Sequence, residues 1–289
     1  MHKGKMYTSA DKIDRELSVV LFDDALRSEI KTTKNITVYK SLRKKGLVDH
    51  KYLFVISQAT NLEKISAFVS EANKKNHLRA LLIRSDIDTE ILPKLMDNAK
   101  LRSLRNTLYH EDPHTPKRIL NAWASGAQNS LIANASVKEN ILFVVSCALQ
   151  FYTCEFKQIP ALQSLPNKER THFQIAEDGR YVYWENQDIH IDLETIKYYT
   201  NKEYREEVDL QKMQYFQNIG EAIKHIRKES GLRQVDIEGF SARQIRRIEN
   251  GRVQLNTATL QKLANSHKMN LDDYLDAIAS QQAQLSEKK

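Results

Sequence analysis

The sequence predicts an α+β chain of several domains, because successive parts of it carry different spacings of apolar residues. Residues 1–115 alternate short apolar runs with helical patterns, which predicts an α/β region of the βαβαβ type. Residues 116–200 hold short strand-like runs separated by turn residues, which predicts an α+β domain. In residues 215–280 the apolar residues recur at helical spacing, which predicts an all-α domain. The charged residues 201–214 are expected to form a helical linker and residues 281–289 a polar tail.

The composition bears on the class of protein and on its compartment. Of the 289 residues, 41% are apolar, which is enough for ordinary cores in two or three domains. The net charge of +7 has the sign that suits a polyanionic partner, and two cysteines suit a reducing compartment. We find neither a signal-peptide pattern nor an apolar run of the roughly 20 residues that span a membrane. We therefore expect a soluble protein of the cytoplasm that associates with the nucleoid and has no membrane partner.

The glycines give no sign of nucleotide chemistry. The chain holds 8 glycines, and none falls in the GxxxxGKS/T or GxGxxG arrangements that bind nucleotide phosphates. We therefore expect no cofactor, no metal and no catalytic residues, and we do not expect an enzyme.

The N-terminal region is expected to fold around a small parallel sheet. Residues 11–30 space their apolar side chains as an amphipathic helix does, and Ile36–Tyr39 form a possible strand. The following elements alternate between strand and helix patterns, an order that predicts a parallel sheet with right-handed crossovers. These elements are a strand at residues 53–56, a helix to about residue 73 opened by a capping box of Thr60 and Glu63, a strand at 78–83, a short helix capped by Asp88, and a strand at 101–109.

Polar residues follow the expected strands, in the place where open parallel sheets bind ligands. Ser57, Asp86 and His110 are the candidates, and a metal, a small ligand or hydrolytic chemistry would each suit them. The alternative is that they cap helices and begin loops, as Ser and Asp commonly do. We favour this alternative, because their spacing matches no metal or catalytic signature.

The central region changes from a mostly helical pattern over residues 119–135 to a series of strands. The Asp178-Gly179 pair predicts a hairpin turn between two of these strands. The strands are expected at residues 141–147, 150–156, 173–176, 181–184 and 189–193. Residues 139–199, with the runs LFVVSC, FKQIPAL, FQIAEDGRYVYW and DIHIDLE, resemble the DUF2442 family. The resemblance implies a small α+β fold and no particular activity.

Two features of the central region could serve an enzyme. Asp188, His190 and Asp192 alternate along an expected strand and would share one face, which could hold a metal. Cys147 and Cys154 could form a redox pair. We favour an ordinary polar sheet face for the first set and small core residues for the cysteines.

The C-terminal region contains the most specific pattern in the chain. Ile219, Ile223 and Ile226 form an apolar stripe on a first helix. A turn and a short second helix follow, and Ser241 is a suitable N-cap for a third helix that ends at Asn250-Gly251. On that third helix the inward residues are Ile245 and Ile248, and the outward residues are Arg243, Gln244, Arg246 and Arg247.

This arrangement predicts a helix-turn-helix that reads DNA. Arg can donate two hydrogen bonds to guanine, and Gln can bond adenine at two points, both in the major groove. The alternative is a solvated basic face, which is what most charge runs are. We reject it because the arginines come with a helix cap and a buried isoleucine pair, in the order that the motif requires.

Residues 217–278 resemble the Cro/cI-type helix-turn-helix family, also called the XRE family. The resemblance rests on IGEAIKHIRKESGL, on the S-x-x-Q-I-x-R-I-E-N-G pattern and on TATLQKLANSHKMNLDDYL. It implies about five helices and a structural salt bridge between Arg227 and Glu249. The implied DNA-contacting residues are Arg243 and Arg247 at base-reading positions, Gln234 and Asn250 at phosphate positions, and Ser241, Ala242, Gln244, Arg246 and Arg252 beside them.

One segment departs from the family pattern. Between Gln234 and Ser241 the chain is shorter than is common in the family, so we expect the second helix to lose about one turn. Phe240 should replace the apolar contacts that this loss removes.

These observations favour a sequence-specific transcriptional regulator, most simply a homodimeric repressor on a palindromic operator in double-stranded DNA. The N-terminal regions would then serve dimerisation or the sensing of a small effector. One alternative is an antitoxin or phage-defence regulator that binds a partner protein and controls its own promoter. The other is a DNA-targeted enzyme with a site near Asp86 and His110.

Overall fold

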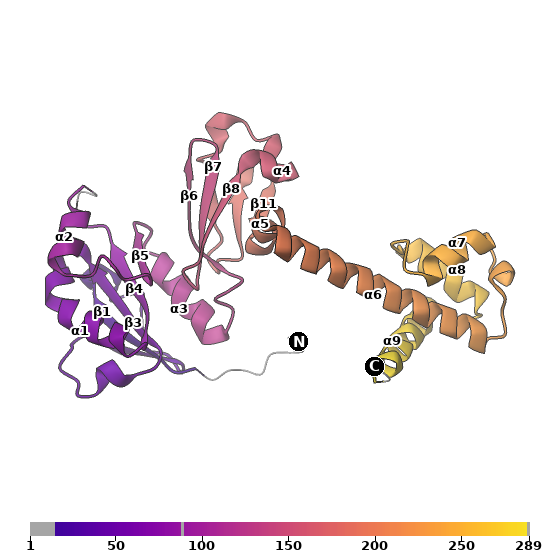
Figure 1. The fold of residues 1–289 in the computed structure, drawn as a ribbon, viewed down its shortest axis with the longest axis horizontal. Helices are drawn as coiled ribbons and strands as arrows, with labels where there is room; N and C mark the ends of the chain where they lie inside the picture. Colours follow the sequence, from indigo (N-terminus) through magenta and orange to yellow (C-terminus); the bar gives the residue numbers. More distant parts are fainter. Residues whose placement is uncertain (1–14, 88–89, 288–289) are drawn as a thin grey trace. The chain divides into compact units, whose positions relative to one another are not determined.

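The computed structural model describes residues 15–87 and 90–287, and its architecture is mixed α+β (Figure 1). The chain divides into two compact units, one running to Thr200 and the other beginning at Asn201. The first unit contains a parallel sheet near the N-terminus, and the second unit is helical. The prediction of an α+β chain with an N-terminal parallel sheet and a C-terminal helical region is therefore confirmed.

Five parallel strands form the first sheet of the first unit, in the order β2-β1-β3-β4-β5. The strands are β1 (Leu17–Phe22), β2 (Ile36–Tyr39), β3 (Leu53–Gln58), β4 (Leu78–Arg84) and β5 (Thr107–His110). Strands β2 to β5 occur where strands were predicted, although β5 is shorter than the expected run at residues 101–109. Because the strand order reverses beside β1, the carboxyl ends of β1 and β3 flank the point where sheets of this kind bind ligands.

The strand β1 corrects the prediction of an amphipathic helix over residues 11–30. Leu17 and Leu21 are buried on one face of the sheet, and Val20 is buried on the other. A strand that is buried on both faces is apolar at nearly every position, so the spacing of its residues also fits a helix. Residues 11–14 of the expected helix lie outside the described residues.

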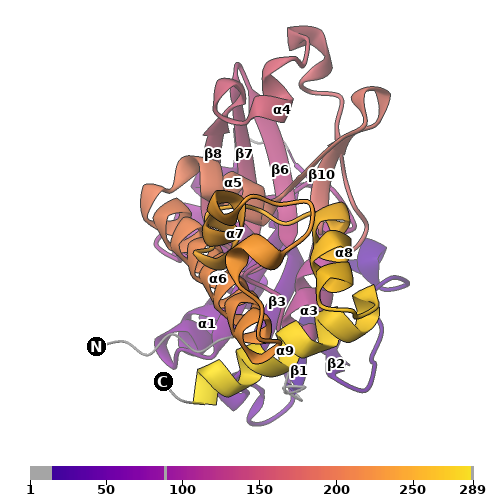
Figure 2. The ribbon, with the colours of Figure 1, turned by 90° about the vertical axis from the view of Figure 1, so that its right-hand side faces the viewer.

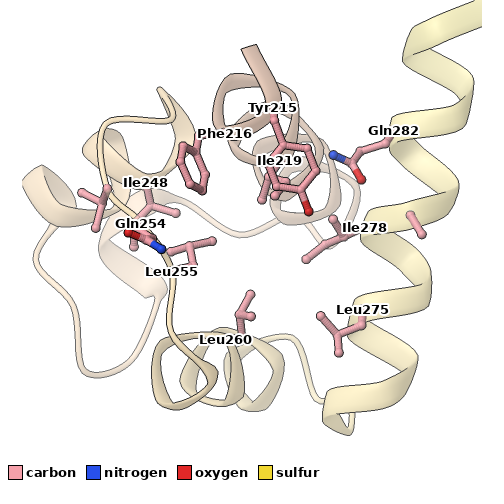
Figure 3. Close-up of a pocket in the computed structure, with 12 residues that line it drawn as sticks. Tyr215, Phe216, Ile219, Ile248, Gln254, Leu255, Leu260, Leu275, Ile278 and Gln282 are labelled. Atoms are coloured by element: carbon pink, nitrogen blue, oxygen red, sulfur yellow. The ribbon is translucent and has the colours of Figure 1, made fainter. Parts of the chain in front are cut away.

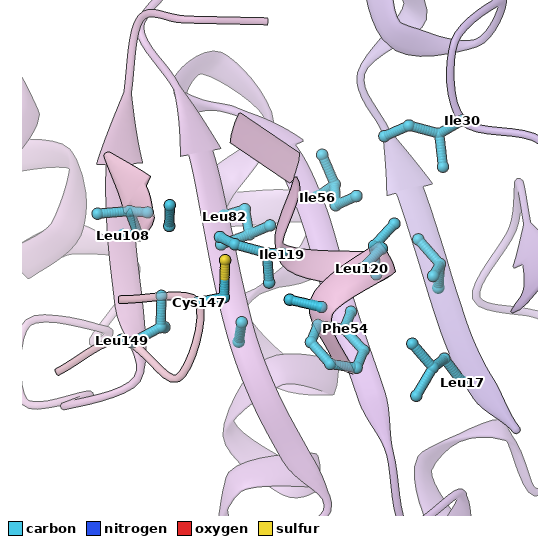
Figure 4. Close-up of a cluster of buried hydrophobic side chains, with 14 of the residues drawn as sticks. Leu17, Ile30, Phe54, Ile56, Leu82, Leu108, Ile119, Leu120, Cys147 and Leu149 are labelled. Atoms are coloured by element: carbon cyan, nitrogen blue, oxygen red, sulfur yellow. The ribbon is translucent and has the colours of Figure 1, made fainter. Parts of the chain in front are cut away.

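Helices cover both faces of this sheet. On one face α1 (Leu62–Lys74) buries Ile65, and α2 (Leu92–Asn98) packs beside α1. On the other face α3 (Thr115–Ser125) buries Ile119 against residues of β1, β3 and β4 (Figure 4). Successive side chains of each strand point to opposite faces of the sheet. Each face therefore packs against its own layer of helices.

The start of α1 differs from the predicted capping box of Thr60 and Glu63. Asn61 occupies the N-cap position, and its side chain accepts no capping hydrogen bond. Thr60 instead donates a hydrogen bond from Oγ1 to Oδ2 of Asp86 at 2.6 Å. The hydroxyl group that the local motif would use is therefore engaged in a tertiary contact. The helix cap predicted at Asp88 lies outside the described residues.

Two antiparallel three-stranded sheets complete the first unit, in the orders β6-β7-β8 and β11-β10-β9. Their strands are β6 (Ile132–Lys138), β7 (Ile141–Ser146), β8 (Phe151–Glu155), β9 (Gln174–Ile175), β10 (Tyr181–Trp184) and β11 (Ile189–Asp192), with the helices α4 (Pro160–Gln163) and α5 (Leu193–Thr200) beside them. Strands β7 to β11 occur where strands were predicted, and Asp178-Gly179 lies in the turn between β9 and β10. Side chains from both sheets surround the buried Trp184.

The segment at residues 119–135 is only partly helical, which corrects the prediction made for it. The helix α3 ends at Gly126, whose left-handed backbone (φ +78°) closes the helix, and β6 begins a few residues later. The predicted boundary between residues 115 and 116 falls at the start of α3, which packs on the parallel sheet. Cys147, which follows β7, joins the same buried cluster as α3 (Figure 4).

The second unit contains four α-helices among the residues described. They are α6 (Lys202–Glu229), α7 (Ala242–Glu249), α8 (Thr257–Ser266) and α9 (Leu271–Glu287). Figure 2 shows α7, α8 and α9 gathered beside α6, which contacts both α7 and α9. Their shared core includes Ile223, Ile245 and Tyr274. In the described part of the chain, no helix combines the length and apolar character that a membrane crossing requires.

Two expectations about the ends of the second unit need correction. Residues 201–214 are helical, as expected, but they form the first half of α6 and not a separate linker; the N-cap residue Asn201 accepts a hydrogen bond from the Tyr204 backbone N–H at 3.0 Å. Residues 281–287 continue α9 instead of forming a tail, and the last two residues lie outside the described part. Both stretches are rich in Glu and Gln, which are strong helix formers although they are polar.

Candidate nucleic-acid interface

The helix α7 begins at a reciprocal cap made by Ser241 and Gln244. The Ser241 Oγ accepts a hydrogen bond from the Gln244 backbone N–H at 3.3 Å, and the Gln244 Oε1 accepts one from the Ser241 backbone N–H at 2.7 Å. The predicted N-cap is therefore confirmed. Because α7 has only eight residues, a cap that contributes about 1 kcal/mol matters for its formation. The Gln244 oxygen is thus turned back toward the start of its own helix.

The inner face of α7 is fixed against α6. Ile245 and Ile248 are buried in the helical core. A Cβ atom on Gly220 would lie 2.5 Å from the Ile248 carbonyl oxygen, and one on Gly251 would lie 2.5 Å from the Gln217 backbone nitrogen. Backbones can approach this closely only where no side chain intervenes, so these two glycines set how near α7 and its following turn come to α6.

A buried ion pair joins α6 to the end of α7. The Arg227 Nε donates to Glu249 Oε1 at 2.5 Å, and its Nη2 donates to Oε2 at 3.3 Å. Gln234 Nε2 donates to the same Oε2 at 2.7 Å, and Arg227 Nη1 donates to the Leu232 carbonyl at 2.6 Å. The salt bridge that the family resemblance implies is thus present. Gln234, which was expected at a phosphate position, uses one amide N–H inside the protein.

The turn before α7 is further reduced than we expected. In place of a second helix that has lost one turn, the structure has a single 3-10 turn, η7 (Gln234–Asp236). Arg233 holds this turn through its backbone N–H and its guanidinium, which donate to the Asp236 carboxylate at 2.8 and 2.9 Å and lower the pKa of that carboxyl. Only residues 237–240 lie between this turn and the N-cap Ser241. Phe240 packs against the helical core, as expected.

The outer face of α7 carries cations. Arg243, Arg246 and Arg247 are exposed, and no ion pair joins them to a carboxylate within the part of the chain that the structure describes. Gln234, Ala242, Arg243 and Arg246 line one hollow of about 320 Å³. The structure therefore brings together predicted residues from η7 and α7 around a single concave surface. Of the other predicted residues, Asn250 and Arg252 are exposed just beyond the helix.

The candidate ligand residues at the strand ends make local contacts. Asp86 accepts hydrogen bonds from the Ala59 backbone N–H at 2.9 Å and from Thr60 Oγ1 at 2.6 Å. The Ser57 hydroxyl, which is buried, donates to the Gln58 carbonyl at 2.9 Å. Both side chains therefore stabilise the turn that leads into α1. This agrees with the interpretation that we favoured, in which they begin loops and hold helix starts.

His110 lies at the same edge of the sheet and is buried. Its Nδ1 lies 3.0 Å from the Asp112 carbonyl oxygen, and its Nε2 has no hydrogen-bond partner among the described residues. Burial lowers the pKa of this histidine, because a charged imidazolium would lose its hydration there. The ring is therefore neutral near pH 7. It does not contact Ser57 or Asp86 through any hydrogen bond in the described structure.

A buried ion pair at these strand ends was not predicted from the sequence. Asp23, directly after β1, is fully buried, and Arg84 donates to it from Nε at 2.5 Å and from Nη2 at 3.0 Å. The Asp23 Oδ1 also accepts a hydrogen bond from the Ala25 backbone N–H at 3.1 Å. The signal was the run VVLF immediately before Asp23. As a buried strand, that run places Asp23 at the carboxyl edge of the sheet, the edge at which β4 ends in Arg84.

We expect Asp23→Ala to lower the free energy of unfolding of the first unit by about 2–3 kcal/mol, because hydrogen bonds to charged groups are lost and Arg84 remains partly buried. Asp24→Ala is the matched control. Its carboxylate pairs with Arg27 on the surface, where such pairs contribute between about 0 and 1 kcal/mol. Urea unfolding of the two variants measures the difference. Equal losses in both would mean that the buried pair is not a significant source of stability.

The other predicted polar groups of the first unit have structural roles. Asp192 Oδ1 accepts a backbone N–H in the first turn of α5, and the His190 ring stacks on Tyr183 with centroids 5.7 Å apart. Asp188 lies just before β11 with φ +50°. Across the residues that the structure describes, no group of three or more His, Cys, Asp or Glu side chains is placed to hold a metal ion.

Cys147 and Cys154 are both buried and carry free thiols. Burial raises the pKa of Cys147 to about 12 and that of Cys154 to about 11. A redox-active cysteine needs a lowered pKa and access to solvent. The two residues therefore fit the interpretation that we favoured, as small side chains of the core.

No family model matches the chain, and no curated protein matches it. A function must therefore be inferred from the residues and contacts of this chain. Among these, the arginine-bearing face of α7 combines exposure, charge and a rigid support.

Proposed function

We propose that the protein is a sequence-specific DNA-binding regulator of transcription that reads the major groove with the outer face of α7. The observation that carries the proposal is the set of exposed arginines on a short helix whose opposite face is buried. Arginine is suited to this task because its planar guanidinium can donate two hydrogen bonds to the O6 and N7 atoms of guanine. Its fixed charge also contributes to phosphate binding.

The dimensions of α7 support the same proposal. An α-helix with its side chains is about 10–12 Å across, and the major groove is about 12 Å wide, so α7, whose eight residues span about 12 Å, can lie in the groove. The reciprocal cap, the isoleucine pair and the buried ion pair hold the helix in one orientation before DNA arrives. A pre-arranged reading helix loses little conformational entropy on binding.

A single unit of this size would contact too little DNA for strong specificity, so we propose that the protein acts as a homodimer on a palindromic operator, as a repressor. The first unit would then supply dimerisation or the sensing of an effector. The decisive experiment is selection of genomic DNA fragments by the full-length protein at a fixed salt concentration. A palindromic motif with two half-sites would support the proposal. Salt-sensitive binding without any motif would contradict it.

Single substitutions separate base reading from phosphate binding. We expect Arg243→Ala to cost about 1–3 kcal/mol of binding free energy and to relax the preference at one base position. We expect Asn250→Ala to weaken binding to all sequences by a similar factor. Lys94→Ala, in the first unit, removes an equal charge from an exposed position and is the control for net charge. Affinity profiles across a set of operator variants measure all three. Identical profiles for Arg243→Ala and Asn250→Ala would refute the assigned roles.

A further inference from the structure

The helical unit contains an apolar cavity of about 360 Å³ behind α7 (Figure 3). Its wall is formed by α6, by the turn after α7, by α8 and by α9. Phe216 and Leu255 lie on one side of the opening, and Leu275 lies on the other, on α9 (Figure 3). Ile248 of α7 also lines the cavity. A ligand inside it would therefore touch the buried face of the helix whose outer face carries the arginines.

The chemistry of the wall is unusual for this chain. Every one of the twelve residues that line the cavity is uncharged, whereas 28% of the residues of the whole chain are charged. An uncharged wall disfavours phosphate, nucleotide or carboxylate ligands, because a desolvated ionic group needs an opposite charge or several hydrogen bonds. The cavity therefore selects a neutral occupant.

A few polar side chains lie at the edge of the cavity. Gln254 and Gln282 lie on opposite sides of it in Figure 3, and the ring of Tyr215 lies near its mouth. A side-chain amide both donates and accepts hydrogen bonds, and a phenol does the same. Binding sites for small molecules have this composition, with a mostly apolar wall, a few polar groups and volumes of about 300–1,000 Å³.

We propose that this cavity binds a small, neutral, mainly apolar molecule with a carbonyl or hydroxyl group at one end. The apolar part would cover the side chains of Phe216, Leu255 and Leu275, and the polar group would bond to Gln254 or Gln282 at the edge. The binding itself does not depend on the proposed DNA-reading function. Its coupling to DNA, through Ile248, does rest on that function.

The probe for this site is prodan, a neutral naphthalene with a ketone at one end, whose emission shifts to the blue when it leaves water. We expect the full-length protein to bind it saturably with one site per chain. Leu255→Trp places a larger side chain in the cavity and should weaken the probe affinity by about tenfold or more. Met213→Trp is the matched control, because it adds the same side chain at an exposed position of α6 outside the cavity wall.

Three outcomes are informative. Saturable binding that Leu255→Trp removes and Met213→Trp keeps would support the site. Equal binding by both variants, or no saturable binding by the wild type, would overturn it. A dimer in sedimentation that forms without the probe, persists when the probe is added and is abolished by Leu255→Trp would also overturn it, because the cavity would then be covered by a second copy. If Leu255→Trp lowers the melting temperature, Ala279→Phe fills the same cavity from α9.

If the site is real and the DNA proposal also holds, saturating prodan should change the operator affinity of the wild type and leave that of Leu255→Trp unchanged. By linkage, operator DNA should change prodan affinity by the same factor. Prodan binding without any effect on DNA would remove the coupling and keep the site. Absence of operator binding in every condition would count against the proposed function alone.

Discussion

Glu249→Ala should destabilise the helical unit by about 3–5 kcal/mol, the range seen when one partner of a buried ion pair is removed. The substitution leaves the Arg227 guanidinium buried beside the start of η7 with its carboxylate partner gone. It also removes the acceptor of the Gln234 amide. The free energy of unfolding of a whole domain is only about 5–15 kcal/mol, so a loss of this size should leave a measurable fraction of molecules with the helical unit unfolded. Hydrogen exchange of the amides of α6 to α9 measures the loss directly.

The double variant Arg227→Met with Glu249→Leu provides the control. Replacing both members of a buried pair by apolar residues of similar size is often neutral, because the desolvation cost of both charges disappears with their attraction. We therefore expect the double variant to be closer to wild type than Glu249→Ala is. If the single and double variants lost equal protection, packing volume and not the unpaired charge would explain the effect.

Gly251→Ala should lower the stability of the helical unit by about 2–5 kcal/mol, through two separate costs. The residue has φ +65°, where any Cβ atom costs about 1–2 kcal/mol. The added Cβ would also lie 2.5 Å from the Gln217 backbone nitrogen, so α7 or α6 must move, and crowding of this kind costs about 1–3 kcal/mol. Thermal unfolding followed by circular dichroism measures the loss.

Gly231→Ala isolates the first of these costs. Gly231 has a similar backbone conformation, with φ +71°, and no atom lies within 4 Å of the position that its Cβ would take. We therefore expect a loss of only about 1–2 kcal/mol for this variant. A Gly251→Ala loss no larger than the Gly231→Ala loss would show that the turn after α7 does not need close contact with α6.

Elements specified by neighbouring residues could be predicted from the sequence. The apolar runs of β3 and β4 indicated strands, and Asp178-Gly179 indicated the turn between β9 and β10. Ser241 was recognisable as an N-cap because its hydrogen bond reaches only as far as Gln244. In each case the interacting groups lie within a few residues, so the spacing in the sequence contains the necessary information.

Features that depend on distant residues could not be predicted in this way. Asp23 and Arg84 are separated by 61 positions, and their pairing follows only from the sheet order, in which β1 and β4 end at the same edge with β3 between them. The Thr60 hydroxyl donates to the carboxylate of Asp86, which is distant in the sequence, and does not cap the helix that follows it. The number of residues between Gln234 and Ser241 indicated a shortened helix, but the local hydrogen bonds of Arg233 decide that a 3-10 turn forms there.

The tryptophans and the cysteines of the chain all lie in the first unit, which helps the two units to be studied separately. Both tryptophans, Trp123 and Trp184, and both cysteines lie before residue 200. Indole fluorescence therefore reports melting of the first unit alone, and the helical unit can be followed by circular dichroism or hydrogen exchange. Because the two native thiols are buried and protonated near neutral pH, one cysteine introduced on the surface of the helical unit would be alkylated first. A fluorophore can thus be attached there without removing the native cysteines.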